Sequence, residues 1–313
     1  MPNRTHWIRW GPPLTADEPH DPQGTGIGAL LRVLRQMRAR RFDLVVLPAI
    51  NPQHRYDQPP HKLLAKSVLD SAAHSAYGAM LCGRLLGPTP HIIVDIGDYP
   101  WLCRTTMRLF PRHALYFKRE LALEAEGPRV RPLSLFVPNE ARLPEARVKD
   151  IDVFFAGDLC NRIRKDAVAA VGGLAGRGFR ILTPDRPLPY PEFLTALARS
   201  WLVLSPEGHG WDCYRHYEAC LAGSVPVINR PRYPRRRYLR DGMHCFYYDP
   251  DEDGLAALLT RLLADRAKLV QMAQAGRRHV LANYTRSAVA RYMLSELAGE
   301  GRAADAAAAA AGA

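Results

Sequence analysis

The sequence predicts an α/β protein built from two doubly wound domains. A chain of 313 residues is too long for one ordinary hydrophobic core and suits two domains of roughly 150 residues each. Short apolar runs also alternate with segments of helical periodicity, a pattern typical of βαβ units and parallel sheets. With 47% apolar and 24% charged residues, the chain has the composition of an ordinary globular protein.

The first domain is predicted to span residues 1–140. The stretch 138–150 contains two prolines and has no apolar periodicity, so it is interpreted as the interdomain linker. Apolar runs and helical periodicity predict strands at 42–50, 91–96, 114–117 and 133–137 and helices at 26–40, 62–86 and 101–109.

The second domain is predicted to span residues 151–298. An alanine-rich tail follows at 303–313; it has nothing to pack against and is expected to be disordered or frayed. Within the domain, the pattern predicts strands at 151–156, 179–183, 201–204 and 225–228 and helices at 162–175, 190–200, 212–222, 252–265, 266–283 and 285–298.

The formal net charge of +12 suits an anionic partner, although an arginine-rich composition alone is an equally simple explanation. The chain has no apolar run of ~18 residues and no signal-peptide pattern at its start, so a cytoplasmic protein is expected. The basic helix at 26–40 is a candidate for peripheral contact with the inner face of a membrane, and a plain surface helix is the simpler interpretation. Reduced thiols are expected for the scattered cysteines Cys82, Cys103, Cys160, Cys213, Cys220 and Cys245.

The segment 205–228 carries the clearest chemical signal. A predicted strand ends at Leu204, and a loop with Gly208 and Gly210 leads into a helix. In parallel sheets, ligands bind at the carboxyl ends of strands, and a helix N-terminus suits phosphate. Arg215 and Glu218 share one helix face; an arginine can clamp a diphosphate and a carboxylate can accept hydrogen bonds from a ribose. A plain Arg–Glu helix pair beside a connecting loop explains the same residues.

The same residues resemble the C-terminal lobe of exostosin-like and group 1 glycosyltransferases. The shared pattern is a strand, Pro206, a glycine, an Arg-x-x-Glu-Ala helix and the run 223–228. Further similar segments are 152–157, 240–242 and 266–289. The resemblance covers residues 150–298 and implies the GT-B fold, in which two Rossmann-like doubly wound domains face a cleft. It also implies a nucleotide sugar on the second domain and an acceptor on the first.

The resemblance further implies roles for individual residues. Arg215, with Arg164 or Arg162, would stabilise the departing nucleoside diphosphate, and Glu218 would hold the ribose. The loop Glu207, Gly208, His209 and Gly210, with Asp241 and Gly242, would contact the donor. Ten residues separate Glu207 from Glu218, whereas the common retaining pattern has seven, so Glu207 cannot simply inherit the role of the first glutamate in that pattern.

Candidate acceptor-side residues follow strands of the first domain. Asp95 and Asp98 come after the strand at 91–96, where a general base would be expected in an inverting enzyme. Lys118 lies in a Tyr-Phe-Lys-Arg-Glu stretch that resembles bacterial exostosin-like proteins. Turn-capping aspartates and a surface lysine are the structural alternative.

The sequence therefore predicts a glycosyltransferase that moves a sugar from a nucleotide-diphosphate sugar to an unidentified acceptor. No cofactor, metal or nucleic-acid partner is expected; His209, Cys213, His216 and Cys220 do not have convincing zinc-ligand spacing. The alternatives are an α/β protein that binds nucleic acid through the arginine-rich loop 230–240, and a non-catalytic GT-B-like nucleotide-binding protein. The stereochemistry and the oligomeric state stay open.

Overall fold

The computed structural model describes residues 35, 39, 44–48, 91–102, 115–125, 127–137, 148–232 and 238–299. Nearly all of the helix predicted at 26–40, the whole of that at 62–86 and most of that at 101–109 lie outside the described residues, as do most of the linker and the alanine-rich tail. The chain divides into two compact units, the first formed by Met1–Val94 and Leu102–Tyr116 and the second by Asp95–Trp101 and Phe117–Ala313.

The N-terminal half contributes a four-stranded sheet. Its strands, in the order β1-β2-β3-β4, are β1 (Val45–Pro48), β2 (His91–Asp95), β3 (Leu115–Arg119) and β4 (Val130–Leu133). The strand predicted at 133–137 was placed too late, because Arg131 and Pro132 interrupt the apolar pattern of β4; Val137 forms only an isolated bridge. Pro132 is compatible with β4 because this strand lies at the edge of the sheet.

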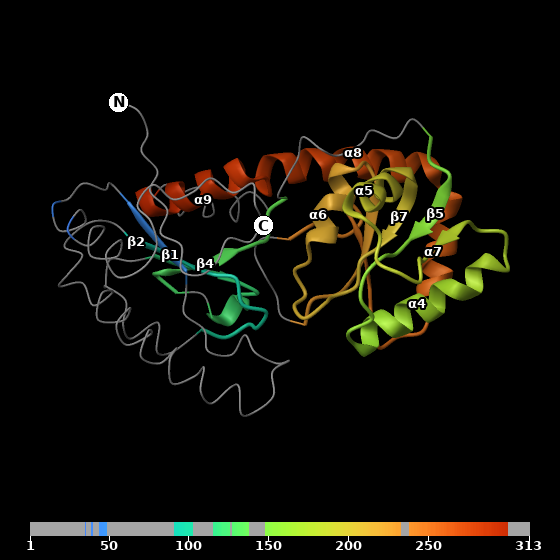
Figure 1. The fold of residues 1–313 in the computed structure, drawn as a ribbon, viewed down its shortest axis with the longest axis horizontal. Coiled ribbons are helices and arrows are strands. Elements are labelled where there is room, and N and C mark those ends of the chain that lie inside the picture. The colour runs from blue at the N-terminus through green and yellow to red at the C-terminus, as the bar shows by residue number, and fades with distance from the viewer. Residues whose placement is uncertain are drawn as a thin grey trace. The chain divides into compact units, whose positions relative to one another are not determined.

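The C-terminal half contains a five-stranded sheet whose paired strands run parallel. Its order is β6-β5-β7-β8-β9 (Figure 1), formed by β5 (Ile151–Phe154), β6 (Ile181–Leu182), β7 (Ser200–Leu204), β8 (Val225–Asn229) and β9 (Phe246–Tyr248). This is the doubly wound order in which the chain changes direction across the sheet between β5 and β7. The short strand β9 was not predicted.

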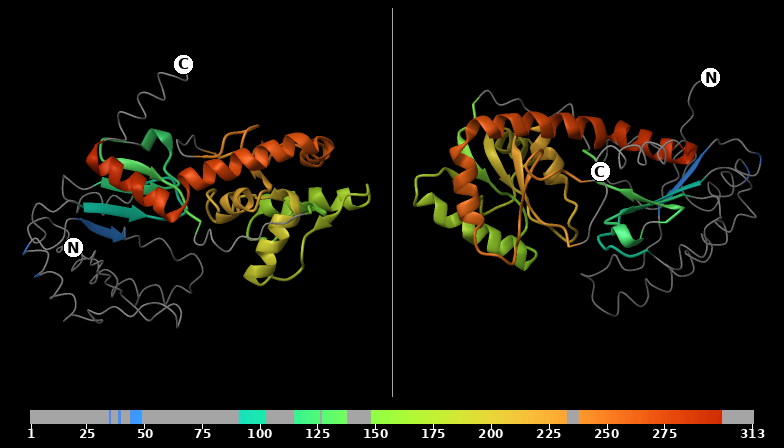
Figure 2. Two further views of the ribbon diagram at one scale, coloured as in Figure 1. Left: turned by 90° about the horizontal axis from the view of Figure 1, so that it is seen from above. Right: turned by 180° about the vertical axis from the view of Figure 1, so that it is seen from behind.

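Helices cover both faces of this sheet (Figures 1 and 2). They are α4 (Arg162–Ala175), α5 (Tyr190–Arg199), α6 (Tyr214–Leu221), α7 (Leu255–Ala264), α8 (Arg266–Asn283) and α9 (Arg286–Ala298). Apolar side chains of α4, α7 and the first half of α8 pack on one face, and those of α5 and α6 pack on the other. Each helix matches a predicted one to within a few residues. None of the helices in the described part is long and apolar enough to span a membrane.

The last helix, α9, explains why β4 and most of β3 group with the C-terminal part. The ring of Phe117 meets Tyr292 edge-on, with centroids 5.6 Å apart. The Tyr292 hydroxyl donates to the carbonyl of Pro132 over 3.0 Å, and Arg131 forms an ion pair with the buried Glu296. Strand β4 and most of β3 thus group with the residues that follow the predicted linker 138–150, rather than with those that precede it. The predicted domain limits stay a prediction.

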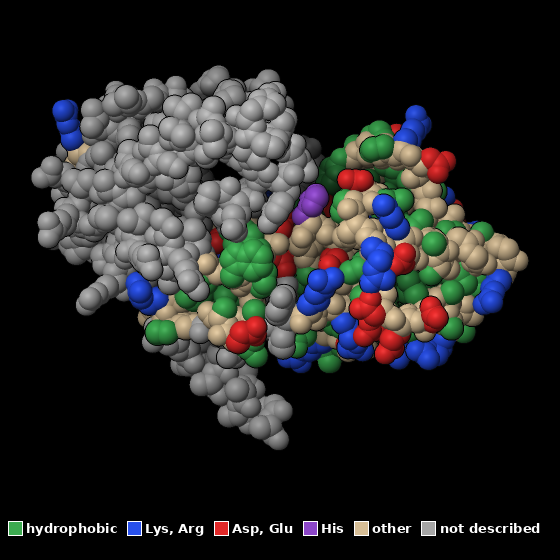
Figure 3. Space-filling model, turned by 90° about the horizontal axis from the view of Figure 1, so that it is seen from below, with side chains coloured by type: hydrophobic (Ala, Val, Ile, Leu, Met, Phe, Trp, Pro, Cys, Tyr) green, Lys and Arg blue, Asp and Glu red, His purple; other side chains and the backbone are tan. Residues whose placement is uncertain are grey.

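Basic and acidic side chains are interspersed on the face of the C-terminal part shown in Figure 3. The arginine-rich loop 230–240 is described only at its ends, where Arg230 forms an ion pair with Asp241 over 3.3 Å. On this face the positive net charge is therefore not gathered into the continuous basic surface that tracks a nucleic-acid backbone.

Candidate functional site

The candidate site lies at the carboxyl ends of β5 and β7, where the strand order reverses. Residues 155–161 leave β5 and lead into α4, while residues 205–213 leave β7 and lead into α6. Loops at such a switch point are the usual ligand-binding position of an open parallel sheet. All the residues discussed below belong to the second of the two compact units.

Arg215, in the first turn of α6, is the central cation of this position. Its Nη2 donates to the carbonyl of Ala156 over 2.5 Å, and its guanidinium lies 4.9 Å from the centre of the Phe155 ring. Its Nε and Nη1 are buried and have no hydrogen-bond partner among the described residues. Burial, reinforced by the neighbouring Arg164, lowers the pKa of Arg215 to about 10. The charged guanidinium is therefore incompletely compensated by the protein itself.

Arg164, in the first turn of α4, is the second buried cation. Its Nε donates to the carbonyl of Glu207 over 2.9 Å, and its Nη1 donates to that of Asp158 over 2.7 Å. Within the described part of the chain, neither Arg164 nor Arg215 forms an ion pair with a carboxylate. We call Arg164 and Arg215 the arginine pair. Two adjacent buried cations supported mainly by carbonyl groups suit an anionic ligand.

Glycines allow the backbone to approach the arginine pair. A Cβ atom at Gly157 would lie 2.2 Å from Nη2 of Arg215, and one at Gly208 would lie 2.6 Å from Nη2 of Arg164. Asn161 fixes the loop that contains Gly208, because its Nδ2 donates to the carbonyls of Glu207 and Gly208 over 3.1 and 2.8 Å. Larger residues at the two glycine positions would displace the guanidinium groups.

Glu218 lies one turn after Arg215 on α6 and is 6% exposed. The hydroxyl of Tyr190 donates to its Oε1 over 2.9 Å. Burial raises the pKa of Glu218, and burial together with this carboxylate raises the pKa of Tyr190 to about 12. A buried carboxylate that can still accept hydrogen bonds suits a ribose diol. The ribose-binding role of Glu218 stays a prediction. Tyr190 was missed because nothing in the sequence pairs it with a residue 28 positions away.

The other residues of the glycine-containing loop differ in their contacts. Oε2 of Glu207 accepts from Nδ2 of Asn229 over 2.7 Å, so this carboxylate is tied to the end of β8. His209 is exposed and Gly210 is buried. The role of Glu207 toward a donor stays a prediction.

His216 holds the loop from inside the protein. Its Nδ1 lies 2.7 Å from the Ser205 hydroxyl and its Nε2 lies 2.8 Å from the carbonyl of Trp211. Burial lowers the pKa of His216 to about 3, so the imidazole is neutral at neutral pH, donates from Nε2 and accepts at Nδ1. Both ring nitrogens are thus engaged within the protein. The absence of a bound metal stays a prediction.

The two candidate bases have different environments. Asp95 is buried and accepts from the backbone N–H of Gly97 over 2.9 Å and from Lys118 Nζ over 3.4 Å. Lys118 is fully buried, with Nζ 4.1 Å from the centre of the Tyr99 ring, and burial lowers its pKa to about 8. The alternative of a surface lysine was therefore wrong. Asp98 has a 35% exposed side chain and forms an ion pair with Arg119, so it is the more accessible carboxylate.

Three residues that were predicted to bind the sugar donor contact parts of the protein other than the arginine pair. Arg162 is exposed and forms ion pairs with Asp166 and Asp251 over 3.2 and 2.5 Å. Asp241 accepts from the backbone N–H of Tyr247 over 3.0 Å, and the neighbouring Gly242 occupies a turn with a φ of 69°. Of the two arginines that the sequence left as alternatives, Arg164 is the one beside Arg215. Donor contacts by the remaining residues stay predictions.

Comparison with known proteins points to sugar transferases. A family model for the RXYLT1 C-terminal domain matches residues 186–241, which include Arg215, Glu218 and the loop before α6. Ribitol-5-phosphate xylosyltransferase 1 of Danio rerio is 54% identical over 37 residues, which are 12% of this chain and 8% of that protein. The resemblance to glycosyltransferases is thus confirmed for this segment, and the chain matches only a small part of the relative's length.

Solved structures show the fold. An alpha-glucosyltransferase in complex with UDP and a 13-mer DNA aligns with a TM-score of 0.55 and 10% identity, covering 85% of this chain and 82% of that one. Sucrose-phosphate synthase from Thermosynechococcus elongatus aligns with a TM-score of 0.49 and 13% identity, covering 90% and 94%. The α/β fold of GT-B glycosyltransferases, as the sequence predicted, is confirmed by the first of these alignments.

Proposed function

We propose that this protein is a glycosyltransferase that moves a sugar from a nucleotide-diphosphate sugar to an acceptor hydroxyl. The observation that carries the proposal is the arginine pair at the sheet's switch point, with two buried nitrogens of Arg215, Nε and Nη1, lacking a hydrogen-bond partner among the described residues. A diphosphate supplies the negative charge and the acceptor oxygens that these groups need. The local match to the xylosyltransferase relative supports the same chemistry.

The arginine pair would act when the bond between the sugar carbon and the diphosphate oxygen breaks. The leaving nucleoside diphosphate gains negative charge in this step, while the acceptor oxygen forms a bond to the same carbon and loses its proton. Donors fixed in a buried site stabilise developing charge more strongly than water does. Arg215 and Arg164 would supply this stabilisation without a metal ion, and Glu218 would hold the ribose.

Asp98 is the candidate base for the acceptor proton in an inverting reaction. A Cβ atom at Gly210 would lie 2.9 Å from its Oδ1, so this carboxylate approaches the same loop whose Gly208 borders Arg164. Its ion pair with Arg119 fixes the carboxylate beside this loop. In a retaining reaction no such base is required, and Asp98 would then only bind the acceptor.

A nucleotide panel tests the proposal. Thermal unfolding with UDP, GDP, ADP and CDP, followed by turnover assays with their sugars, is expected to reveal one base whose diphosphate stabilises the protein and whose sugar is consumed. Saturating ligand at ~100 times its Kd stabilises by about 2.7 kcal/mol, an effect that is easily measured. Stabilisation without turnover under any acceptor would favour a non-catalytic nucleotide-binding protein. No response to any nucleotide, with tight salt-sensitive binding to DNA or RNA, would contradict the proposal.

A further inference from the structure

Strand β3 ends with the charged residues Lys118 and Arg119, and Glu120 follows directly. The proposed function has so far used only Arg119, as the partner of Asp98. Lys118, Arg119 and Glu120 are consecutive, and all three are buried. Glu120 is also the one non-glycine residue with a positive φ, 64°, within the described part of the chain. A side chain in this left-handed region costs roughly 1 kcal/mol and persists only where the surroundings hold it.

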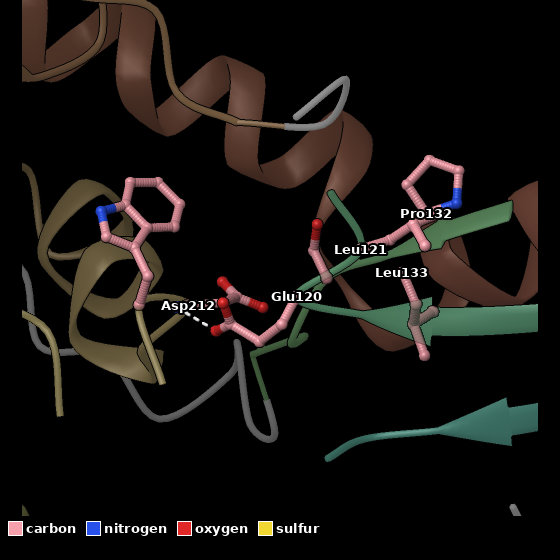
Figure 4. A pocket seen from close by; sticks show the side chains of 7 residues that line it. Glu120, Leu121, Pro132, Leu133 and Asp212 are labelled. Carbon is pink, nitrogen blue, oxygen red and sulfur yellow. Dashed lines mark hydrogen bonds between the residues drawn. The ribbon is translucent and has the colours of Figure 1, made fainter. Parts of the chain in front are cut away.

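The contacts of Glu120 and Arg119 converge on Asp212, which lies just before α6. Oε1 of Glu120 accepts from the backbone N–H of Asp212 over 2.6 Å, and Nη2 of Arg119 donates to the carbonyl of the same residue over 2.5 Å. Figure 4 shows the Glu120 carboxylate directed at Asp212. Both backbone polar groups of this residue are therefore held by one dipeptide, 92 or 93 positions earlier in the chain.

The side chain of Asp212 extends the same attachment. Its Oδ2 accepts from the backbone N–H of Leu135 over 2.7 Å, and its Oδ1 accepts from the Tyr217 hydroxyl over 2.5 Å. Nε of Arg119 lies 3.5 Å from Oδ2. Asp212 is thus fixed by backbone and side chain before the helix begins at Tyr214.

Gly210 shows how closely the loop is held against this cluster. A Cβ atom there would lie 2.7 Å from Oε1 of Glu120 and 3.0 Å from Nη2 of Arg119. A methyl group could enter only if these charged side chains moved. Before Gly210 in the chain comes Gly208, which borders Arg164, and after it comes Arg215 in the first turn of α6. A shift at Gly210 would therefore reach both members of the arginine pair.

We propose that Glu120 is a positioning residue for the diphosphate site, a role that rests on the proposed function. With Arg119 it fixes the backbone of residues 208–213, and this fixes the first turn of α6, from which Arg215 reaches the ligand. Glu120 acts through the loop and does not itself touch the diphosphate. Because its contacts include Asp98 through Arg119, the same cluster joins the donor loop to the candidate acceptor base.

The test compares Glu120→Ala with Glu120→Gln by calorimetric titration. The probes are the nucleoside diphosphate selected by the panel and the corresponding nucleoside without phosphates. Glu120→Ala is expected to weaken diphosphate binding about ten-fold or more, the effect of one lost charge-assisted hydrogen bond, and nucleoside binding less than about two-fold. Glu120→Gln keeps a side-chain oxygen that accepts from Asp212, so it should restore diphosphate binding to within about three-fold of wild type.

Two further variants control for stability and folding. Glu296→Gln alters another buried carboxylate, 4% exposed and paired with Arg131 on β4, and should leave the affinity for both probes unchanged. Gly210→Ala disturbs the same cluster from the opposite side and should mimic Glu120→Ala, which keeps the test decisive where Glu120→Ala does not fold. Equal loss of affinity for diphosphate and nucleoside in both variants would overturn the positioning role.

The two proposals fail in distinguishable ways. If the wild-type protein binds no nucleoside diphosphate, the proposed function is overturned and the inference falls with it. If the wild type binds one, and both Glu120→Ala and Gly210→Ala bind it with unchanged Kd, the positioning role alone is overturned.

Discussion

Replacing Arg215 by alanine is expected to weaken nucleoside diphosphate binding strongly while leaving the free protein nearly as stable as wild type. Two nitrogens of the buried guanidinium, Nε and Nη1, have no hydrogen-bond partner among the described residues, and a diphosphate is proposed to accept from them. Two charge-assisted hydrogen bonds contribute about 1.5–3 kcal/mol each, so Kd should rise by about 100-fold or more. Calorimetric titration with the diphosphate selected by the panel measures this change.

The small effect on stability has its own reason. Arg215→Ala removes a packed side chain that contacts Phe155 and Ala156, which destabilises the fold. It also removes a buried cation whose charge is incompletely compensated, which stabilises it. The two effects oppose each other, so thermal unfolding of the free variant should differ from wild type by no more than about 1 kcal/mol.

Arg199→Ala is a matched control for the binding measurement. Arg199 is 47% exposed and pairs with Asp150 at the other end of the sheet's strands, so its loss should leave Kd unchanged. If Arg215→Ala binds the diphosphate within about three-fold of wild type, the arginine pair is not the anion site.

Asp212→Ala is expected to cost the fold about 3–5 kcal/mol, because it leaves a buried charge and buried donors without their acceptor. Asp212 is 4% exposed and accepts from the Leu135 backbone and the Tyr217 hydroxyl beside the buried Arg119. The free energy of unfolding, measured by urea denaturation, gives the cost directly. Asp212→Asn keeps an acceptor oxygen but no charge, so it should lower the free energy of unfolding by less than Asp212→Ala does.

An exposed aspartate supplies the comparison. Asp251 is 74% exposed and pairs with Arg162 on the surface of α4, and exposed pairs contribute about 0–1 kcal/mol. Asp251→Ala should therefore change the free energy of unfolding by less than about 1 kcal/mol. A loss of the same small size in Asp212→Ala would show that the cluster around Arg119 does not hold the loop.

Much of the C-terminal fold could be predicted because local signals coincide there. The helices predicted at 162–175 and 266–283 have these bounds in the structure, since Asn161 and Asp265 cap periodic segments through hydrogen bonds to backbone N–H groups. Strand β9 was missed because it has only three residues, too few for a periodicity.

The site was predictable only where its residues are near in sequence. The three-residue spacing of Arg215 and Glu218 places both on one face of α6, as a local pattern can show. Arg162 and Arg164 are two residues apart, hence on different faces of α4, and only the packing of that helix selects Arg164. The attachment of Asp212 to Glu120 joins residues 92 positions apart; its one local hint is three consecutive charges at the end of an apolar strand.

A crystal structure of the complex with the nucleoside diphosphate selected by the panel tests the central claim most directly. The account predicts phosphate oxygens within ~2.7–3.2 Å of Nε or Nη1 of Arg215, with Arg164 on the same diphosphate and the ribose facing Glu218. A diphosphate bound elsewhere, with Nε and Nη1 of Arg215 left without a partner, would contradict it.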